Sequence, residues 1–193
     1  RELVDRWRPV VYGPRAEAIE GIDRRLAGGD RFVAEGTGTA LRVLDVPGHT
    51  RGHIAYVAEP FGDDPRPLLF CGDTLFAAGC GRLFEGTPAQ MLASLDRLAA
   101  LAPDTLVYCA HEYPIANLRF AAACDPASDA VRARLEEARA MRAAGLRTVP
   151  SSIAIERDTN PFLRCGTAGV RAALAARLGH APGTRLEAFA ALR

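Results

Sequence analysis

The sequence contains no lysine, and all 24 of its basic residues are arginine. This absence excludes enzymes that form a Schiff base through lysine, and P-loop proteins, whose phosphate site needs a lysine. Long apolar runs are also absent, because none approaches the roughly 20 residues that span a bilayer. Residues 1–6 do not resemble a signal peptide. A membrane association is therefore not expected.

Charge of one sign is equally scarce, with 24 basic and 23 acidic residues and a net charge of +1. Nucleic acid is not an expected partner, because the chain lacks the long-range field that attracts it. The five cysteines form no Cys-x-x-Cys pair, and an odd number in a chain of 193 residues argues against a disulfide framework. We therefore expect a reducing, cytoplasmic setting.

What is present suffices for a core, since 49% of the residues are hydrophobic. Short β segments punctuated by glycine and proline are predicted at 9–12, 41–46, 54–57, 68–71 and 105–108. Helices are predicted from the capping box at Thr87, at 115–123, at 128–144, at 167–178 and from the capping box at Thr184, with a connector at 148–164. The chain is therefore of the α/β (α+β) class, with strands first and helices last.

Three candidate metal ligands each follow a predicted strand. His49 lies in Pro47-Gly48-His49, Asp73 follows Gly72, and His111 follows Cys109-Ala110. Strand ends present reactive groups, and imidazole and carboxylate bind divalent metals. A carboxylate can bridge two ions, so the three residues together favour a metal site, although each alone could be structural.

Two further residues have weaker claims. His53 is expected just inside the following strand, which favours a hydrogen-bonding role in support of the site over metal ligation. Cys80 is a possible nucleophile, but no histidine lies near it in the sequence and its Gly-Cys-Gly setting suits a backbone loop.

Several motifs in order along the chain resemble one family. They are Pro47-Gly48-His49-Thr50-Arg51-Gly52-His53, Gly72-Asp73-Thr74-Leu75-Phe76, Gly79-Cys80-Gly81-Arg82-Leu83-Phe84, His111-Glu112-Tyr113, Asn117-Leu118-Arg119-Phe120 and Asn160-Pro161-Phe162. Together they resemble glyoxalase II, the hydroxyacylglutathione hydrolase family of the metallo-β-lactamase superfamily. The first two motifs are found across the superfamily, whereas the later ones are specific to this family.

The resemblance implies a metallo-β-lactamase αββα sandwich, here only its later part, at residues 1–111, and a C-terminal helical domain that binds glutathione at residues 112–193. It implies that His49 ligates one metal, His111 ligates the other and Asp73 bridges them, in a centre of two divalent ions. Zinc is expected there, with iron or manganese as alternatives. A metal-bridged hydroxide would then hydrolyse S-lactoylglutathione to glutathione and D-lactate, in methylglyoxal detoxification.

The same resemblance assigns the substrate site. Arg82, Leu83 and Phe84 match a loop that holds the glutathione backbone, while His111 and Tyr113 contact the substrate. Arg193 matches an arginine near the glycine carboxylate, which a guanidinium can bind through two hydrogen bonds. The expected partner is a small molecule, the glutathione thioester. The expected oligomeric state is a monomer.

One family motif is missing: the His-x-His-x-Asp-His segment that supplies four more metal ligands is not in the sequence. The sequence also starts without methionine and stops inside an expected helix. We therefore expect a fragment of an active enzyme that is poorly active by itself. The alternatives are a non-catalytic relic that binds glutathione conjugates, and a persulfide dioxygenase-like member of the superfamily.

Overall fold

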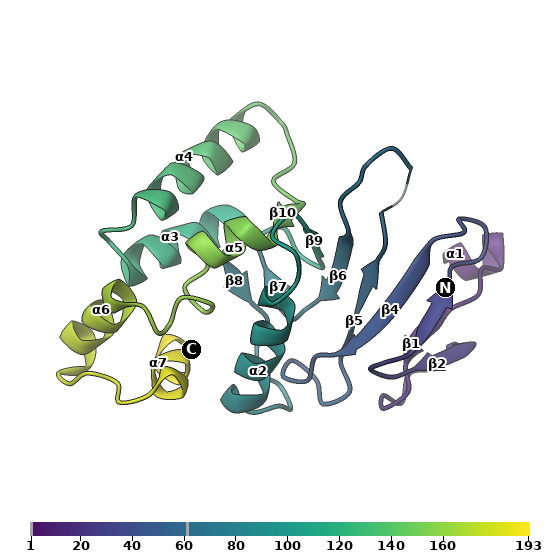
Figure 1. Ribbon diagram of the computed structural model, residues 1–193, viewed down its shortest axis with the longest axis horizontal. Helices are drawn as coiled ribbons and strands as arrows, with labels where there is room; N and C mark the ends of the chain where they lie inside the picture. The colour runs from purple at the N-terminus through teal and green to yellow at the C-terminus, as the bar shows by residue number, and fades with distance from the viewer. Residues whose placement is uncertain (1, 61) are drawn as a thin grey trace.

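A computed structural model describes residues 2–60 and 62–193. Figure 1 shows the strands of residues 12–72 on the right of the molecule and most of the helices that follow residue 113 on the left, with the later short strands between them. The strands are β1 (Tyr12–Pro14), β2 (Arg24–Leu26), β3 (Arg31–Val33), β4 (Ala40–Asp45), β5 (Ile54–Ala58), β6 (Leu68–Gly72), β7 (Leu75–Phe76), β8 (Gly79–Cys80), β9 (Leu106–Cys109) and β10 (Ser151–Ser152). The helices are α1 (Glu2–Trp7), α2 (Pro88–Ala99), α3 (Pro114–Cys124), α4 (Asp129–Ala143), α5 (Ile153–Thr159), α6 (Ala168–Leu178) and α7 (Arg185–Leu192).

Six strands form the main sheet, in the order β10-β9-β6-β5-β4-β3. All neighbouring pairs are antiparallel except β6 and β9, which are parallel. Parallel neighbours need a crossover connection, and α2 lies in the connection between these two strands. The β1–β2 pair and the β7–β8 hairpin form two small separate sheets.

The two faces of the sheet differ because side chains alternate along each strand. Val57, Leu69 and Val107 are register neighbours on β5, β6 and β9 and belong to the buried core that also contains Leu95 of α2. An aromatic row lies on the opposite face of the sheet. It consists of Tyr56, Phe70 and Tyr108, which are also register neighbours and are each adjacent in sequence to one of the core residues. Phe70 is 40% exposed there.

Helices continue the same core into the second half of the chain. Val170 of α6 and Phe189 of α7 belong to the cluster that contains Leu69 and Leu95. Helices α3 and α4 pack together over a smaller cluster that includes Leu118, Leu135 and Ala78. Among the described residues, no helix is both long and apolar enough to cross a membrane.

Most predicted elements are confirmed, including both capping boxes. The segment predicted as a strand at 9–12 is wrong in position, because β1 begins only at Tyr12. Pro9 lacks an N–H donor, and the N–H of Val11 bonds to the Asp23 carboxylate instead of to a strand.

The predicted connector at 148–164 is also incomplete, since it contains β10 and α5. The Ser152 hydroxyl accepts a hydrogen bond from the Ile155 N–H and so caps this helix. Ile153, Glu156 and Thr159 are buried along it. The acidic residue Glu156 therefore faces the protein interior.

Candidate metal centre

The three predicted ligands meet at one edge of the main sheet. His49, Asp73 and His111 lie on the loops that follow β4, β6 and β9. The Asp73 Oδ1 atom lies 3.2 Å from His111 Nε2, and its Oδ2 atom lies 4.0 Å from His49 Nε2. Each oxygen of a single carboxylate therefore faces a different imidazole.

His49 is oriented by the loop that contains Arg82. Its Nδ1 atom lies 2.9 Å from the Arg82 carbonyl oxygen, so Nδ1 carries the proton and Nε2 is free to bind a metal. The N–H groups of Phe84 and Glu85 donate to the His49 carbonyl oxygen. The Phe84 ring lies 4.8 Å from the imidazole. This loop therefore fixes both the backbone and the ring of His49.

Asp73 is held from behind by His53. The Asp73 N–H donates to His53 Nε2 at 3.1 Å, while His53 Nδ1 donates to the Ile54 carbonyl oxygen at 3.0 Å. Burial lowers the pKa of His53, which favours the neutral ring that can accept this bond. This is the hydrogen-bonding role that the sequence predicts for His53.

Glycines allow the turns that precede His49 and Asp73. Gly72 has a φ of +52°, and a Cβ there would lie 2.6 Å from the His53 ring. Gly48 has a φ of +155°, and a Cβ there would lie 2.9 Å from Met91. A larger residue would therefore strain either turn and displace a neighbour.

His111 is held mainly by ring contacts. Its side chain is 49% exposed, compared with 19% for His49. The Tyr113 ring stacks on it at 5.2 Å, and the Phe76 ring meets it edge-on at 5.8 Å. The neighbouring Glu112 carboxylate accepts bonds from the backbone and hydroxyl of Thr148, which tie the loop to the helical region.

The predicted substrate residues surround this edge unevenly. Phe84 and Tyr113 are 68% and 53% exposed and lie beside His49 and His111, respectively. Arg82 is exposed as well. Arg193 donates to the Gly81 carbonyl oxygen at 2.7 Å, so the last residue lies beside this loop. Leu83, in contrast, packs against the core, and its side chain contributes support rather than an exposed surface.

A cleft of about 650 Å³ lies directly beside the candidate ligands. His49, His53 and Asp73 line it together with Tyr56 and Phe70 of the aromatic row. This volume falls within the range of about 300–1,000 Å³ that is typical of small-molecule sites. The edge of the sheet therefore combines reactive side chains with space for a ligand.

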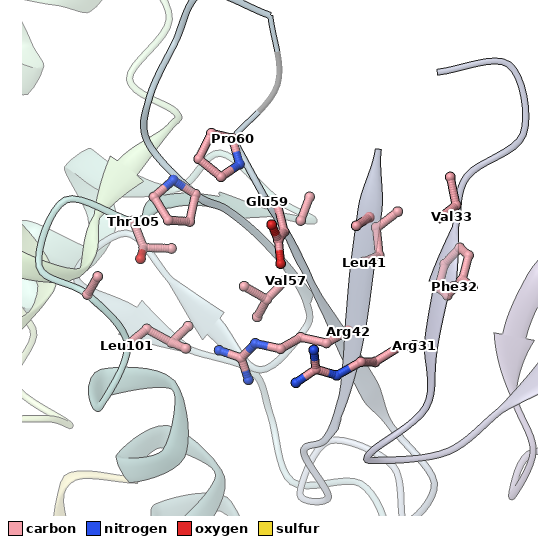
Figure 2. A pocket seen from close by; sticks show the side chains of 14 residues that line it. Arg31, Phe32, Val33, Leu41, Arg42, Val57, Glu59, Pro60, Leu101 and Thr105 are labelled. Atoms are coloured by element: carbon pink, nitrogen blue, oxygen red, sulfur yellow. The ribbon is translucent and has the colours of Figure 1, made fainter. Parts of the chain in front are cut away.

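A second cleft, of about 410 Å³, lies on the α2 side of the sheet. Figure 2 shows the Arg31 and Arg42 side chains extending toward Leu101 there. None of the predicted metal or substrate residues lines this cleft. It is therefore separate from the candidate metal centre.

The donor set fits a bridging carboxylate between two metal positions, with one histidine on each side. Among residues 2–60 and 62–193, however, no group of three or more histidine, cysteine or acidic side chains can hold one ion by itself. A catalytic zinc normally has about three protein ligands. The described residues therefore provide fewer ligands than a two-metal centre would need.

Cys80 does not have the features of a nucleophile. Burial raises the pKa of its thiol to about 11, so the thiol stays protonated at neutral pH. Its sulfur accepts a hydrogen bond from Arg193. This geometry supports a structural role for Cys80.

Sequence reasoning missed a second group of residues around the site. Asn117, Glu156 and Asn160 hydrogen-bond to the backbone of the β7–β8 hairpin, which directly follows Asp73. The asparagines belong to motifs that carry the family resemblance, but no local pattern in the sequence indicates their contacts. Glu156 lies in the segment predicted as a connector, and no sequence feature indicates that it is buried.

Comparison with known proteins agrees with the resemblance. Residues 1–111 match the metallo-beta-lactamase superfamily, and residues 112–193 match the family described as the hydroxyacylglutathione hydrolase C-terminus. The chain is 57% identical to a hydroxyacylglutathione hydrolase of Cupriavidus taiwanensis over 89% of its own length. It spans 64% of the length of that relative.

Two other matches extend over most of the chain. A hydroxyacylglutathione hydrolase of Halorhodospira halophila is 50% identical over 100% of this chain and 72% of its own length. The crystal structure of ETHE1 from Myxococcus xanthus is similar with a TM-score of 0.56 and 26% identity, over 84% of this chain and 55% of that chain. The fold, the two matched regions and the curated relatives together establish that this chain belongs to the hydroxyacylglutathione hydrolase family of the metallo-β-lactamase superfamily.

Proposed function

We propose that the protein, in its complete form, hydrolyses the thioester of glutathione with a 2-hydroxy acid. The proposed substrate is S-lactoylglutathione, and the products are glutathione and D-lactate. The observation that carries the proposal is the placement of Asp73, whose two oxygens face His49 and His111 separately. The names of the curated relatives support the same reaction.

His49, Asp73 and His111 would hold two divalent metal ions, and zinc is the metal we propose. When bound, such ions polarise a carbonyl group and lower the pKa of water far enough for attack at neutral pH. Asp73 would be shared between the ions, while the Arg82 carbonyl keeps His49 Nε2 available. His53 holds the Asp73 backbone so that the carboxylate keeps its direction.

Residues around the centre would bind the glutathione part of the substrate. Glutathione carries carboxylates, which suit the exposed guanidinium group of Arg82 and that of Arg193. Phe84 and Tyr113 expose aromatic rings beside His49 and His111, respectively. We propose that these rings flank the acyl-sulfur bond as it approaches the metals.

We also propose different roles for the two parts of the chain. Residues 1–111 would supply the metal ligands, and residues 112–193 would supply the helical part of the glutathione site. We propose a monomer in the cytoplasm. All five cysteines are free, which supports a reducing compartment.

The test uses the complete gene product loaded with zinc. Wild type should release glutathione and D-lactate from S-lactoylglutathione, with about two metals per chain. Asp73→Asn, which keeps the shape of the side chain, should lose on the order of a hundredfold or more in kcat/KM. Metal content measured by mass spectrometry and D-lactate measured by a coupled assay give two independent readouts.

Two outcomes would contradict the proposed reaction. One is a complete wild-type protein that binds two metals but leaves the thioester intact. The other is one iron per chain, which would favour the persulfide dioxygenase-like alternative. Rapid hydrolysis by the 193-residue chain alone would contradict only our expectation that this chain is poorly active by itself.

A further inference from the structure

The β7–β8 hairpin is the common support of all three candidate ligands. Asp73 lies just before it, and the Gly81 N–H, just after it, donates to the Thr74 carbonyl oxygen. Arg82, one residue further on, orients His49. Phe76 within the hairpin meets the His111 ring edge-on. The position of the hairpin therefore sets the geometry on both sides of Asp73.

The hairpin is too short to hold its own shape, because each strand has only two residues. Side chains from the helical region bind its tip instead. Asn160 Nδ2 donates to the carbonyl oxygens of Phe76 and Gly79 at 3.2 and 2.8 Å. Asn117 Nδ2 donates to the Ala77 carbonyl oxygen at 2.9 Å.

Glu156 provides the remaining contact to the tip. Its Oε2 atom accepts a hydrogen bond from the Ala78 N–H at 2.8 Å. Ala78 has a φ of +54°, a left-handed conformation that is unfavourable for any residue other than glycine. Such a conformation persists only where its surroundings hold it. Glu156 binds the backbone at this unfavourable residue.

Glu156 also connects the other contacts. The residue is 1% exposed, and its carboxylate accepts bonds from Asn160 Nδ2 at 2.9 Å and from the Ser151 hydroxyl at 2.5 Å. The side chain therefore joins the tip of the hairpin to β10 and to the end of α5. A group this deeply buried cannot touch a substrate in the cleft.

We propose that Glu156 is a positioning residue for the metal centre, which it holds in place through the β7–β8 hairpin. The inference rests on the proposed function, because it assigns Glu156 to the geometry of the same three ligands. Loss of its carboxylate would release Ala78, let the hairpin tip move and misplace Asp73 relative to both histidines. Groups that orient metal ligands typically contribute about 10–100-fold to metal affinity.

A set of variants separates positioning from general stability. Glu156→Gln keeps the shape, accepts bonds from Ala78 and Asn160 through its oxygen, and can donate to the Ser151 oxygen through its amide. Glu156→Leu has a similar size but removes the acceptor that the Ala78 N–H, the Asn160 amide and the Ser151 hydroxyl share. Leu174→Ala, in α6, is the matched control, because it removes buried core volume from a helix that packs mainly against α3 and α7.

The experiment uses the complete gene product. Zinc affinity is measured by competition with a chelator, amide hydrogen exchange is followed at Phe76–Cys80, and urea unfolding reports stability. Glu156→Leu should lose zinc affinity by about 10–100-fold and lose hairpin protection. Leu174→Ala should unfold at a lower urea concentration but keep the wild-type zinc affinity and hairpin protection. Glu156→Gln should also keep the wild-type zinc affinity and hairpin protection. If Glu156→Leu does not fold, Glu156→Asp replaces it, since the shorter side chain cannot reach Ala78.

Two results would overturn the inference alone, given a wild type that binds zinc and hydrolyses the thioester. One is wild-type zinc affinity in the Glu156→Leu or Glu156→Asp variant. The other is an equal loss of zinc affinity in Leu174→Ala, because that would make the effect one of stability only. A wild type that binds no zinc would instead overturn the proposed function, and the inference with it.

Discussion

The strand region and the helical region contribute differently to the same site. The side chains of His49, Asp73 and His111 are 19%, 29% and 49% exposed, and they approach one another without a dense hydrogen-bond network. Glu156 and Asn160 are 1% and 0% exposed, and several hydrogen bonds surround each of them. The groups that can reach a ligand are therefore the open ones, and the groups that fix their positions are buried behind them.

This division has a physical reason. A ligand-binding group must keep an unused lone pair that faces a cleft, so the fold cannot satisfy it internally. Its position must then be fixed through its backbone and its neighbours. The β7–β8 hairpin transmits this support, because helical side chains hold its tip and Asp73 lies at its base. Variants in the two regions should consequently fail in different ways.

The largest expected effect is the loss of metal affinity in the Asp73→Asn variant, which lies in the strand region. Zinc affinity of the complete protein should fall on the order of a thousandfold, which corresponds to about 4 kcal/mol, because both metal positions lose a shared ligand. The free energy of unfolding of the metal-free protein should change by no more than about 0.5 kcal/mol, as for other partly exposed sites. Chelator competition and urea unfolding measure the two quantities. If the metal-free Asp73→Asn variant were much less stable than the metal-free wild type, the strand region and the helical region would not differ in the way we propose.

The helical counterpart is Asn160→Ala, which should act on stability first. It removes the donor to the Phe76 and Gly79 carbonyl oxygens and the acceptor for the Phe162 N–H, all of them buried. Each unsatisfied buried group costs about 1–3 kcal/mol, so we expect the three groups together to cost at least about 3 kcal/mol. Urea unfolding of the metal-free protein measures it. Asn117→Ala, which removes one bond from a half-buried residue, is the control and should cost about 1 kcal/mol.

The sequence predicted the open part of the site well. His49, Asp73 and His111 each follow a strand and a glycine or a small residue, and this local pattern is enough to place them at one sheet edge. The strands at 41–46, 54–57 and 68–71 are confirmed because alternation and turn residues are local signals. The structure confirms only that these three side chains lie close together. Their roles as metal ligands and the roles of the substrate residues remain predictions.

The buried support could not be predicted in the same way. Glu156 lies 78 residues from Ala78, and the two come together through the packing of α5 against β10 and against α2 and α4. Helix α7 shows the same limit. Helical spacing from the capping box at Thr184 predicts that Leu186, Phe189 and Ala190 face inward, but α7 buries Ala188, Phe189 and Leu192 and leaves Leu186 40% exposed. Periodicity identifies a helix, but the direction of its buried face depends on its tertiary neighbours.

A smaller effect is expected on the pH dependence of the free energy of unfolding, because Glu156 is a buried carboxyl group. Burial raises its pKa above the ordinary value of 4.5, although bonds from Ser151, Asn160 and Ala78 and the nearby Arg134 act in the opposite direction. The folded state therefore binds the proton more tightly than the unfolded chain does. Its contribution to stability is fully present below about pH 4.5 and is lost as the pH rises through the folded-state pKa.

Glu156→Gln cannot titrate and should lack this slope. Relative to wild type, the variant should gain free energy of unfolding as the pH rises from 4.5, by no more than about 1.4 kcal/mol per pH unit. Parallel urea titrations between pH 4 and pH 8 measure the difference. A constant difference over this range would mean that burial does not raise the pKa of Glu156.

The smallest effect is expected where the two regions meet at the surface. Arg185 of α7 binds Asp96 of α2 through two hydrogen bonds of 2.7 and 2.6 Å, and both side chains are about half exposed. Exposed ion pairs contribute little, because water screens the charges and ordering the side chains costs entropy. Arg185→Ala should therefore lower the free energy of unfolding by only about 0.5–1 kcal/mol and leave zinc affinity unchanged. A loss as large as that of Asn160→Ala would mean that surface contacts, as well as the buried hairpin contacts, hold the helical region on the sheet.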